Sequence, residues 1–412
     1  MLTELGKKAK AASRVIGVAD TETKNRALIT IADSLEANAE RILNANALDM
    51  ENGRKNGMSR ALLDRLSLTK ERISGFAGGM RDVTKLPDPV GRTLDDFTRP
   101  NGLHIMKVAV PLGVIGIIFE ARPNVTADAA ALCLKSGNAV ILRGGSDAIN
   151  SNMAICSVMR EGLVRAGLPE DCVQLVEDTT RESANALMRL NGYVDVIIPR
   201  GGAGLIRAVV ENATVPVIET GAGTCHIYVD KDADIAMAAE IIDNAKTSRP
   251  SVCNAAECML IHRGIAEKAL PVICEKLLSK KVEIRGDKTV TELVSQAKSA
   301  EKEDWGREYN DYIIAAKVVD SISEAIDHIN MYGTGHSECI VTENTAAAEE
   351  FMAKVDAAAV YHNASTRFTD GGEFGFGAEI GISTQKLHAR GPMGLKELTT
   401  YKYLINGNGQ IR

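Results

Sequence analysis

One cysteine stands where a sulfur nucleophile can be held in place. Cys253 lies in the segment 251–255, just before the apolar run 259–261. At the mouth of such a run, the end of a strand or helix can fix a thiolate, and a thiolate beside a carboxylate can take an acyl group. A plain core cysteine is the competing interpretation, because free cysteines are among the most buried residue types. The surroundings of Cys253 favour the nucleophile.

Two other polar side chains follow predicted strands and suit the same chemistry. Asn124, after the predicted strand 114–119, offers a side-chain amide that can hold a developing oxyanion. Glu219, after the predicted strand 215–218, offers a base that would activate a nearby thiol. Sequence spacing alone does not bring either residue to Cys253, and the segment around Asn124 is equally compatible with a plain turn.

Two glycine segments at strand ends indicate a nucleotide site. Gly201 and Gly202 follow the predicted strand 194–198 and open a helix, where backbone N–H groups can face a phosphate. Arg143 follows the predicted strand 139–142, and open α/β sheets bind ligands at the carboxyl ends of their strands. An ordinary turn explains either segment alone, and no complete G-x-G-x-x-G fingerprint occurs. Together in one domain they favour a nucleotide.

The elements that must position these residues begin with a helical lead-in. Helical spacing of apolar residues extends to about residue 85, where the proline-containing segment 86–89 ends it. Asn101-Gly102 then joins the strand-like runs 91–98 and 103–110, which predicts a hairpin. Its polar first arm fits a protruding element that pairs with another subunit, and an ordinary surface hairpin is the alternative.

From residue 114 onward, short apolar runs alternate with helical stretches, which predicts doubly wound parallel sheets. The expected strands are 114–119, 139–142, 173–176, 194–198 and 215–218, followed by a second series at 226–229, 257–261, 313–319, 337–341 and 358–361. The charged segment 286–308 is expected to be an irregular surface excursion. We expect a cofactor-binding domain (1–90 and 111–225), a catalytic domain (226–380) and an oligomerisation element (91–110 and 395–412).

The bulk composition excludes several classes of protein. The chain has 412 residues, 45% of them hydrophobic, a net charge of −6 and only 4% aromatic residues. Without a long basic run, nucleic acid and anionic membranes are disfavoured as partners. Without a signal peptide or an apolar span of about 20 residues, a cytoplasmic protein is expected. The eight cysteines are scattered without Cys-x-x-Cys spacing, so reduced thiols and no metal centre are expected.

Six segments carry a family resemblance over nearly the whole chain. The chain resembles the aldehyde dehydrogenase superfamily, and the last of the six segments is similar to one branch of it, the γ-glutamyl phosphate reductases (glutamate-5-semialdehyde dehydrogenases). The segments are 111–116, 120–124, 135–144, 249–255, 333–338 and 377–394. The resemblance implies an α/β fold of the aldehyde dehydrogenase type, with two doubly wound domains and a small β oligomerisation element.

The resemblance also implies roles for matched residues. Cys253 matches the nucleophile and Asn124 the oxyanion-holding amide of the superfamily. Arg143 stands where the superfamily usually has a lysine near the cofactor ribose, and Glu308 where it has a ribose-binding glutamate. NAD-preferring relatives carry an acid at the position of Ser146. A missing carboxylate beside a guanidinium suits a 2′-phosphate, so NADPH is the expected cofactor.

The implied reaction is the NADPH-dependent reduction of L-glutamate 5-phosphate to L-glutamate 5-semialdehyde and phosphate, the second step of proline biosynthesis from glutamate. It passes through a thioester on Cys253. Arg122 and Arg249, which flank proposed catalytic residues, are candidates for the substrate phosphate, and Arg367 for its α-carboxylate. For each arginine, a surface salt bridge is the alternative.

Two other functions stay open. Glu219 falls where hydrolytic aldehyde dehydrogenases keep the base that activates water, so an NAD(P)-dependent enzyme that hydrolyses its thioester is one alternative. A non-catalytic scaffold with the same fold is the other. The expected partners are a small-molecule substrate and further copies of the chain, in a homodimer or higher homo-oligomer. The lability of an acyl phosphate in water also favours a contact with glutamate 5-kinase.

Overall fold

The computed structural model describes residues 2–120 and 122–412. Met1 and Ala121, the latter inside the predicted segment 120–124, lie outside the described residues, as does the side chain of Ala61. The chain forms two compact units. Unit 1 comprises Met1–Thr220, Gly375–Gly381 and Met393–Arg412, and unit 2 comprises Gly221–Phe374 and Ile382–Pro392. The assignment of cofactor, catalytic and oligomerisation roles to segments of the chain stays a prediction.

Unit 1 begins with the predicted helical lead-in, which is confirmed. The helices are α1 (Leu2–Ile16), α2 (Thr21–Ala37), α3 (Ala39–Lys55), α4 (Arg60–Leu66) and α5 (Lys70–Lys85). The Asp20 carboxylate caps α2 by accepting from the Thr23 N–H, and the apolar face of α2 is fully buried at Leu28 and Ile31. Backbones approach closely where α2 meets α7, since a Cβ on Gly162 would lie 3.0 Å from the Ile31 Cα.

The core of unit 1 is a four-stranded parallel sheet in the order β5-β4-β3-β6. Its strands are β3 (Val114–Phe119), β4 (Ala139–Arg143), β5 (Val173–Leu175) and β6 (Val196–Arg200), and its helices are α6 (Pro123–Lys135), α7 (Ile149–Arg165), α8 (Arg181–Met188) and α9 (Ala203–Asn212). The predicted strand 215–218 is wrong. It is reduced to one bridge between Val217 and Ile197, because Pro216 has no N–H with which to continue a ladder.

Unit 2 is built on a seven-stranded parallel sheet in the order β10-β9-β11-β8-β7-β12-β13. The strands are β7 (Cys225–Val229), β8 (Ala256–His262), β9 (Glu283–Gly286), β10 (Lys298–Ser299), β11 (Ile313–Val319), β12 (Ser337–Val341) and β13 (Ala359–His362). The helices are α10 (Ile235–Thr247), α11 (Ala266–Ser279), α12 (Lys288–Leu293), α13 (Ile322–Tyr332) and α14 (Thr345–Lys354). Helices α10, α11 and α12 bury one face of the sheet, and α13 and α14 bury the other.

The predicted irregular excursion 286–308 is also wrong. Strand β9 ends where this segment begins, and β10 lies within it. Both strands extend the edge of the sheet, and α12 lies between them in sequence. Its charged residues are engaged in ion pairs, such as Arg285 with Asp304 at 2.8 Å and Lys298 with Glu283 at 2.6 Å. A high charge content therefore concealed regular structure.

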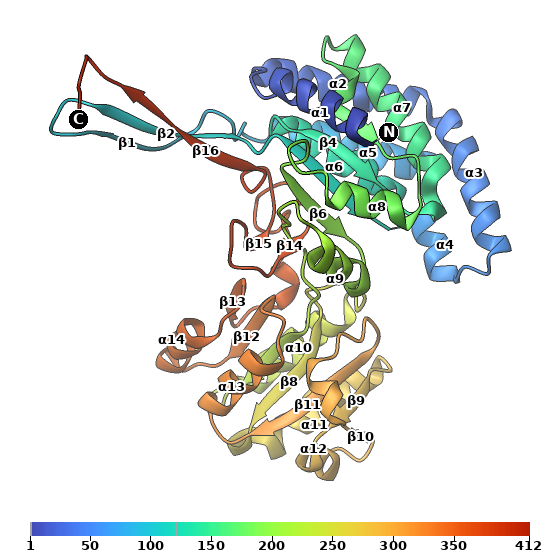
Figure 1. Ribbon diagram of the computed structural model, residues 1–412. Helices are drawn as coiled ribbons and strands as arrows, with labels where there is room; N and C mark the ends of the chain where they lie inside the picture. The colour runs from blue at the N-terminus through green and yellow to red at the C-terminus, as the bar shows by residue number, and fades with distance from the viewer. Residues whose placement is uncertain (1, 121) are drawn as a thin grey trace. The chain divides into compact units, whose positions relative to one another are not determined.

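The predicted hairpin and C-terminal strand are confirmed as a separate antiparallel sheet in the order β1-β2-β16, drawn in Figure 1 as a long ribbon. It consists of β1 (Thr93–Thr98), β2 (His104–Pro111) and β16 (Thr399–Asn406). Gly102 in the connecting turn has a φ of 87°, a conformation that favours glycine. We call this three-stranded sheet the arm. Every residue of β1, and all of β16 after Thr399, is exposed.

Two short strands, β14 (Ile382–Ser383) and β15 (Gly391–Pro392), pair antiparallel in the glycine-rich C-terminal part of the chain. Within the described part of the chain, no helix has both the length and the apolar character that crossing a membrane requires.

Candidate active site

Cys253 differs from the other cysteines in exposure. It lies in the turn just before β8 and is partly exposed, whereas the other seven cysteines, all of them described, are buried. Burial raises the thiol pKa of Cys133, Cys156, Cys172, Cys225, Cys274 and Cys339. A thiolate is the reactive form of cysteine and burial disfavours it. Cys253 is therefore the best-placed cysteine to meet a substrate.

The backbone carbonyl group of Cys253 is held by residues at the start of β7. The Cys225 thiol donates to the Cys253 carbonyl oxygen at 3.2 Å. Gly223 packs so closely that a Cβ on it would lie 1.4 Å from the same oxygen. The Gly223 N–H in turn donates to the Glu308 carboxylate at 3.0 Å. This position requires glycine for its close approach, and any larger residue there would displace the nucleophile.

The residue after the nucleophile ties the turn to a second loop. The Asn254 amide donates to the carbonyl oxygens of Arg367 (3.2 Å) and Thr369 (3.0 Å), and its own carbonyl group accepts from the Arg367 guanidinium. The Thr366 hydroxyl donates to the Asn254 backbone carbonyl at 2.7 Å. Asn254 is buried and these groups are all satisfied, so the geometry next to Cys253 is rigid.

Two of the predicted substrate arginines lie together beside Cys253. Partial burial lowers the pKa of Arg367, the neighbouring Arg249 lowers it further, and Asp370 and the Cys253 sulfur oppose these effects. Arg249 is exposed and Arg367 is partly buried. Arg367 is oriented by its Nε, which donates to the Ser248 hydroxyl at 3.1 Å. Two cations near a thiol provide an anion-binding setting for an acyl phosphate.

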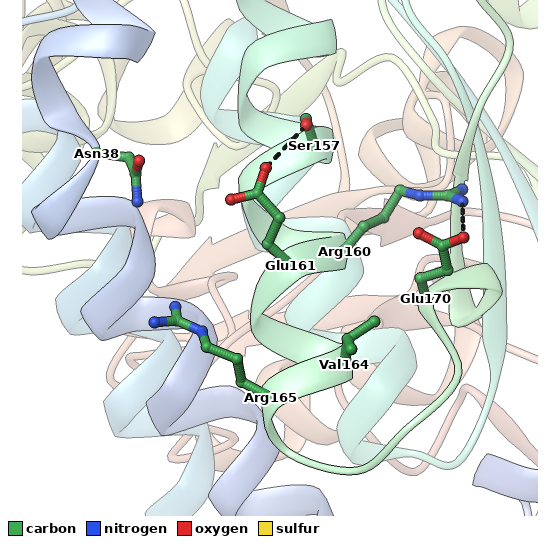
Figure 2. Close-up of a pocket in the computed structure, with 7 residues that line it drawn as sticks. All are labelled: Asn38, Ser157, Arg160, Glu161, Val164, Arg165 and Glu170. Atoms are coloured by element: carbon green, nitrogen blue, oxygen red, sulfur yellow. Dashed lines mark hydrogen bonds and ion pairs between the residues drawn. The ribbon is translucent and has the colours of Figure 1, made fainter.

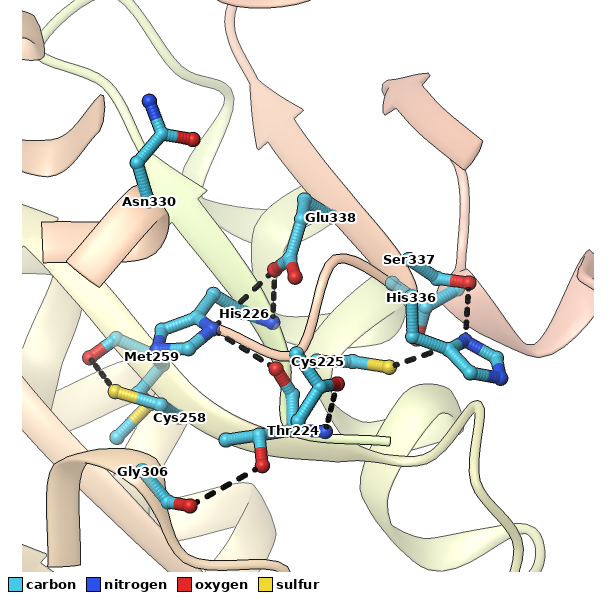
Figure 3. Close-up of polar contacts among 12 residues, drawn as sticks. Thr224, Cys225, His226, Cys258, Met259, Gly306, Asn330, His336, Ser337 and Glu338 are labelled. Atoms are coloured by element: carbon cyan, nitrogen blue, oxygen red, sulfur yellow. Dashed lines mark hydrogen bonds and ion pairs between the residues drawn. The ribbon is translucent and has the colours of Figure 1, made fainter. Parts of the chain in front are cut away.

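A buried polar network lies beneath this turn, around the Cys225 thiol (Figure 3). The Cys225 sulfur is 3.8 Å from His336 Nδ1, which is 2.8 Å from the Ser337 hydroxyl. Ser337 donates to the Thr369 hydroxyl, which also contacts the Tyr361 hydroxyl at 2.7 Å. Burial lowers the pKa of His336 to about 4, so its ring is neutral near pH 7. The network links β7 to the loop that holds Arg367.

In unit 1, predicted site residues gather at the carboxyl ends of adjacent strands. Arg122 and Asn124 follow β3, and both are exposed at the start of α6. The Asn124 amide donates to the Asp128 carboxylate one turn later at 3.0 Å. An amide has two N–H donors, so this contact orients the group without using both.

The predicted ribose-binding region follows β4. Arg143 is partly buried and donates from Nη2 to the carbonyl oxygens of Thr179 (2.6 Å) and Thr180 (2.7 Å). Burial lowers the pKa of Arg143, and its buried Nε has no hydrogen-bond partner among the described residues. Ser146 is exposed at the start of the short helix η1 (Ser146–Ala148). A buried guanidinium with an unused donor is suited to an anionic ligand.

The predicted glycine segment follows β6, and a carboxylate already occupies it. The Gly202 N–H donates to the Glu120 carboxylate at 2.9 Å, at the N-terminus of α9. Gly201 is also in close contact, since a Cβ on it would lie 2.7 Å from the same carboxylate. A carboxylate at a helix N-terminus is favourable for the same reason that a phosphate is. A phosphate at this point would have to displace Glu120.

A surface hollow in unit 1 has a volume of about 500 Å³ and is lined by none of the predicted site residues; Figure 2 shows its lining side chains. Its charged groups already have partners: Arg160 lies 3.1 Å from Glu170, Glu161 forms an ion pair with Arg41 at 2.8 Å, and the Arg165 guanidinium donates to the Ser34 hydroxyl. This pairing leaves the hollow little reason to bind a charged substrate.

The structure therefore brings the predicted residues together in two sets, one in each unit. Cys253, Arg249 and Arg367 form a cluster in unit 2, where Glu308 is linked to the cluster through Gly223. Glu219 is partly exposed in unit 1, just beyond the reduced strand 215–218. The other set, at the strand ends of unit 1, is Arg122, Asn124, Arg143, Ser146, Gly201 and Gly202.

Sequence reasoning did not predict four residues that position the nucleophile: Gly223, Cys225, Asn254 and Thr369. The available signals were local: Asn254 directly follows Cys253, and Gly223 ends the glycine-containing stretch 219–223. The tie from Asn254 to Thr369 spans 115 residues of sequence, a separation that no spacing rule reveals.

Comparisons with known proteins are consistent with this arrangement. The model of the aldehyde dehydrogenase family matches residues 3–311. Gamma-glutamyl phosphate reductase from Clostridium perfringens is 62% identical over 407 residues, covering 99% of this chain and 98% of that protein. The protein of the same name from Caldanaerobacter subterraneus is 60% identical, with 98% of each chain covered.

Solved structures agree with the sequence comparison. The crystal structure of gamma-glutamyl phosphate reductase from Thermotoga maritima is similar with a TM-score of 0.98, at 52% identity and 99% coverage of both chains. An acetylating aldehyde dehydrogenase from Geobacillus thermoglucosidasius, 18% identical, shares the fold at a TM-score of 0.68, with 99% of this chain and 97% of that chain covered. The fold predicted from the resemblance is confirmed.

Proposed function

Since the chain belongs to the aldehyde dehydrogenase family, and within it to the gamma-glutamyl phosphate reductases, we propose that it reduces L-glutamate 5-phosphate to L-glutamate 5-semialdehyde and inorganic phosphate. This reaction is the second step of proline biosynthesis from glutamate. The observation that carries the proposal is the setting of Cys253, a partly exposed thiol on a rigid turn beside Arg249 and Arg367.

Cys253 acts as the nucleophile. Its thiolate attacks the acyl carbon of the substrate, the bond to the phosphate oxygen breaks, and phosphate leaves with the electron pair of that bond. The product is a thioester on Cys253. Asn124 and the Cys253 N–H are proposed to donate to the oxyanion that develops on the carbonyl oxygen, an effect worth about 3 kcal/mol per donor in other enzymes. Reduction of the thioester by hydride would give a thiohemiacetal on Cys253. When this thiohemiacetal collapses, the sulfur departs as thiolate and the aldehyde is released.

The arginines are proposed to bind the charged ends of the substrate. Arg249, exposed near the thiol, suits the leaving phosphate, and Arg122 is a second candidate for it. Arg367 suits the α-carboxylate, because its guanidinium is fixed by Ser248 and Asn254 while it stays partly exposed. A fixed guanidinium gives up little side-chain entropy when it binds a carboxylate.

NADPH is the proposed cofactor, and its nicotinamide supplies the hydride that reduces the thioester. The residues of unit 1 fit a phosphorylated nucleotide in part. The buried Nε of Arg143 has no hydrogen-bond partner among the described residues. Ser146, three residues later, carries no charge that would repel a phosphate. Glu308, a residue of unit 2, is the candidate for a ribose hydroxyl. The Gly201–Gly202 segment fits less well, because Glu120 already accepts its N–H.

Hydrolysis of the thioester is the second candidate function, and Glu219 is the observation that favours it. The two reactions differ in what accepts the acyl group. In the oxidative direction, with glutamate 5-semialdehyde and NADP⁺, the reductase needs inorganic phosphate as acceptor, whereas a hydrolase uses water.

The test is the rate of NADP⁺ reduction with and without phosphate. We expect activity that depends on phosphate and is abolished in Cys253→Ala, with Cys274→Ala as the control for loss of a buried cysteine far from the thiol turn. Activity independent of phosphate would replace the reductase by a hydrolytic dehydrogenase. Activity that survives in Cys253→Ala would show that Cys253 is not the nucleophile. If the wild type and every variant lacked activity, the result would favour a non-catalytic scaffold protein.

The arm is proposed to pair with a second copy of the chain. It exposes large apolar side chains on both faces, including Phe97, Tyr401, Tyr403, Leu404 and Ile405. Three strands without a covered face are marginally stable in water, and unpaired edges favour association. A homodimer or higher homo-oligomer follows. A contact with glutamate 5-kinase, which would protect the acyl phosphate from water, is a separate proposal.

A further inference from the structure

Three side chains that bind metals converge inside unit 2, away from the thiol turn. His226 on β7, Cys258 on β8 and His328 on α13 present their ligand atoms within 4.8 Å of one another. His226 and Cys258 are completely buried and His328 is 5% exposed. Figure 3 shows His226 between Cys258 on one side and Glu338 on the other.

The sheet register explains this convergence. β7 lies between β12 and β8, and His226 is the register partner of Cys258. On the other side, the His226 N–H donates to the Glu338 carboxylate at 2.6 Å. His226 and Cys258 project from the face of the sheet that α13 covers, and His328 faces them from α13, its ring edge-on to the His226 ring with centroids 5.6 Å apart. The arrangement is therefore fixed by three strands and one helix.

The cluster is incompletely satisfied by hydrogen bonds. The Nε2 atoms of His226 and His328 have no hydrogen-bond partner among the described residues, although both are buried. A buried polar atom without a partner destabilises the folded state. The Cys258 sulfur makes a long contact, 4.0 Å, with the Met259 carbonyl. Three poorly satisfied ligand atoms facing one another need a common partner.

The other nitrogen of His226 is held as in many metal sites. Nδ1 lies 3.1 Å from the Thr224 carbonyl and 3.3 Å from the Glu338 carboxylate. Both are acceptors, so they hold the Nδ1 side of the ring in place and leave Nε2 facing Cys258 and His328. A carboxylate or carbonyl behind a ligating histidine is the usual outer partner of protein-bound zinc.

We propose that His226, Cys258 and His328 bind a Zn²⁺ ion that links β7, β8 and α13. Two imidazoles and one thiolate form a ligand set that Zn²⁺ favours, and a water can complete the tetrahedron. Binding deprotonates the Cys258 thiol, whose proton goes to solvent, and the charges of the thiolate and Glu338 balance the ion. A tetrahedral zinc site has ligand separations of about 3.3–3.8 Å, so small side-chain rotations complete it.

The site has a structural role, because it is closed to substrates. It lies at the beginning of the two strands that hold Gly223 and Cys253, and so it fixes the base of the thiol turn. The sequence predicts no metal centre, because His226, Cys258 and His328 are far apart along the chain and only the register of the sheet brings them together.

The test uses the full-length protein, purified without an affinity tag that binds metal. After gel filtration, elemental analysis is expected to find about one zinc per chain in the wild type and in Cys274→Ser, and none in Cys258→Ser. For the chelated protein loaded with Co²⁺, we expect a thiolate-to-cobalt charge-transfer band that persists in Cys253→Ala, since that variant lacks only the accessible thiol. The band is absent from Cys258→Ser.

Variants that fail to fold do not decide the question, because the wild-type readouts are sufficient. A zinc content near zero, no cobalt–thiolate band, and a melting temperature unchanged by a strong chelator or by added Zn²⁺ would overturn the proposal. Those results would leave the cluster as a packed pair of histidines beside a thiol. A band that disappears in Cys253→Ala would also overturn it, since the metal would then be bound at the thiol turn.

Discussion

At the scale of single residues, Gly223 has the strictest requirement near the thiol. A Cβ at this position would lie 1.4 Å from the Cys253 carbonyl oxygen, a distance that no rotamer relieves. Gly223→Ala is therefore expected to push the thiol turn away from β7 and to lower kcat/KM at least about 100-fold, since misplacement by 1 Å has that effect in other enzymes.

The matched control for this substitution is Gly75→Ala in α5, where a Cβ meets nothing within 4 Å. It is expected to leave activity unchanged and to raise the melting temperature slightly, because alanine favours a helix over glycine by about 1 kcal/mol. Wild-type kinetics in Gly223→Ala would show that the turn is not held as described.

Arg143 supports a prediction about cofactor choice. Arg143→Ala removes the guanidinium proposed to face the 2′-phosphate, so the KM for NADPH is expected to rise about 10-fold or more while the KM for NADH changes little. Initial rates with both cofactors give the comparison. If the KM values for NADPH and NADH rose equally, the role of Arg143 would be to hold Thr179 and Thr180. If neither KM rose, Arg143 would not belong to the cofactor site.

At the scale of elements, a buried ion pair joins α10 to β8. Lys246 Nζ lies 2.6 Å from the Glu257 carboxylate, and both side chains are completely inaccessible to solvent. Burial lowers the pKa of Lys246 and raises that of Glu257 to about 7, and the attraction between the two opposes both shifts. Lys246→Met strands the carboxylate and is expected to cost about 3–5 kcal/mol of stability, whereas Lys246→Met with Glu257→Gln costs much less.

The pH dependence of the single variant follows from the same pair. A carboxyl whose pKa is raised in the folded state favours folding more as it takes up its proton. In Lys246→Met the Glu257 carboxyl loses the attraction that lowers its pKa, so that pKa lies above about 7. The deficit of Lys246→Met in melting temperature, relative to the double variant, is therefore expected to shrink as the pH falls from that value toward the usual pKa of a glutamate carboxyl. A deficit that is constant with pH would mean that the loss comes from packing and not from the stranded charge.

Most elements could be predicted from the sequence because they depend on local patterns. The apolar run 114–119 coincides with β3, and helices begin at residues that cap them, such as Asp20 before α2 and Asp234 before α10. The two wrong predictions have physical causes. Pro216 interrupts a strand-like run, and the ion pairs of the segment 286–308 make its strands look like a solvated loop.

The site was predictable only where residue type and strand ends were informative. Cys253, Asn124 and Arg143 could be singled out because each follows or precedes an apolar run. The contacts that hold them could not, because Asn254 reaches Arg367 across 113 residues and Cys225 reaches Cys253 across 28. Such pairs are decided by the order and register of strands, which local sequence does not encode.

At the scale of the whole molecule, we propose that the arm determines the oligomeric state. Tyr403 and Ile405 on β16 are 53% and 58% exposed in the single chain. Tyr403→Asp with Ile405→Asp would place charges in the proposed contact between copies, so a shift to monomers is expected in light scattering after gel filtration. Val18→Asp, at a residue 86% exposed on unit 1, is the control and should leave the mass unchanged. A wild type that is already monomeric would contradict the proposal.

The central claim is that Cys253 carries the acyl group and that phosphate removes it. The most direct measurement is the mass of the intact protein and of its peptides after incubation with glutamate 5-semialdehyde and NADP⁺ in buffer free of phosphate. We predict one glutamyl group per chain, located on Cys253 and lost when phosphate is added. An acyl group on another residue, or one that water removes as fast as it forms, would contradict the account.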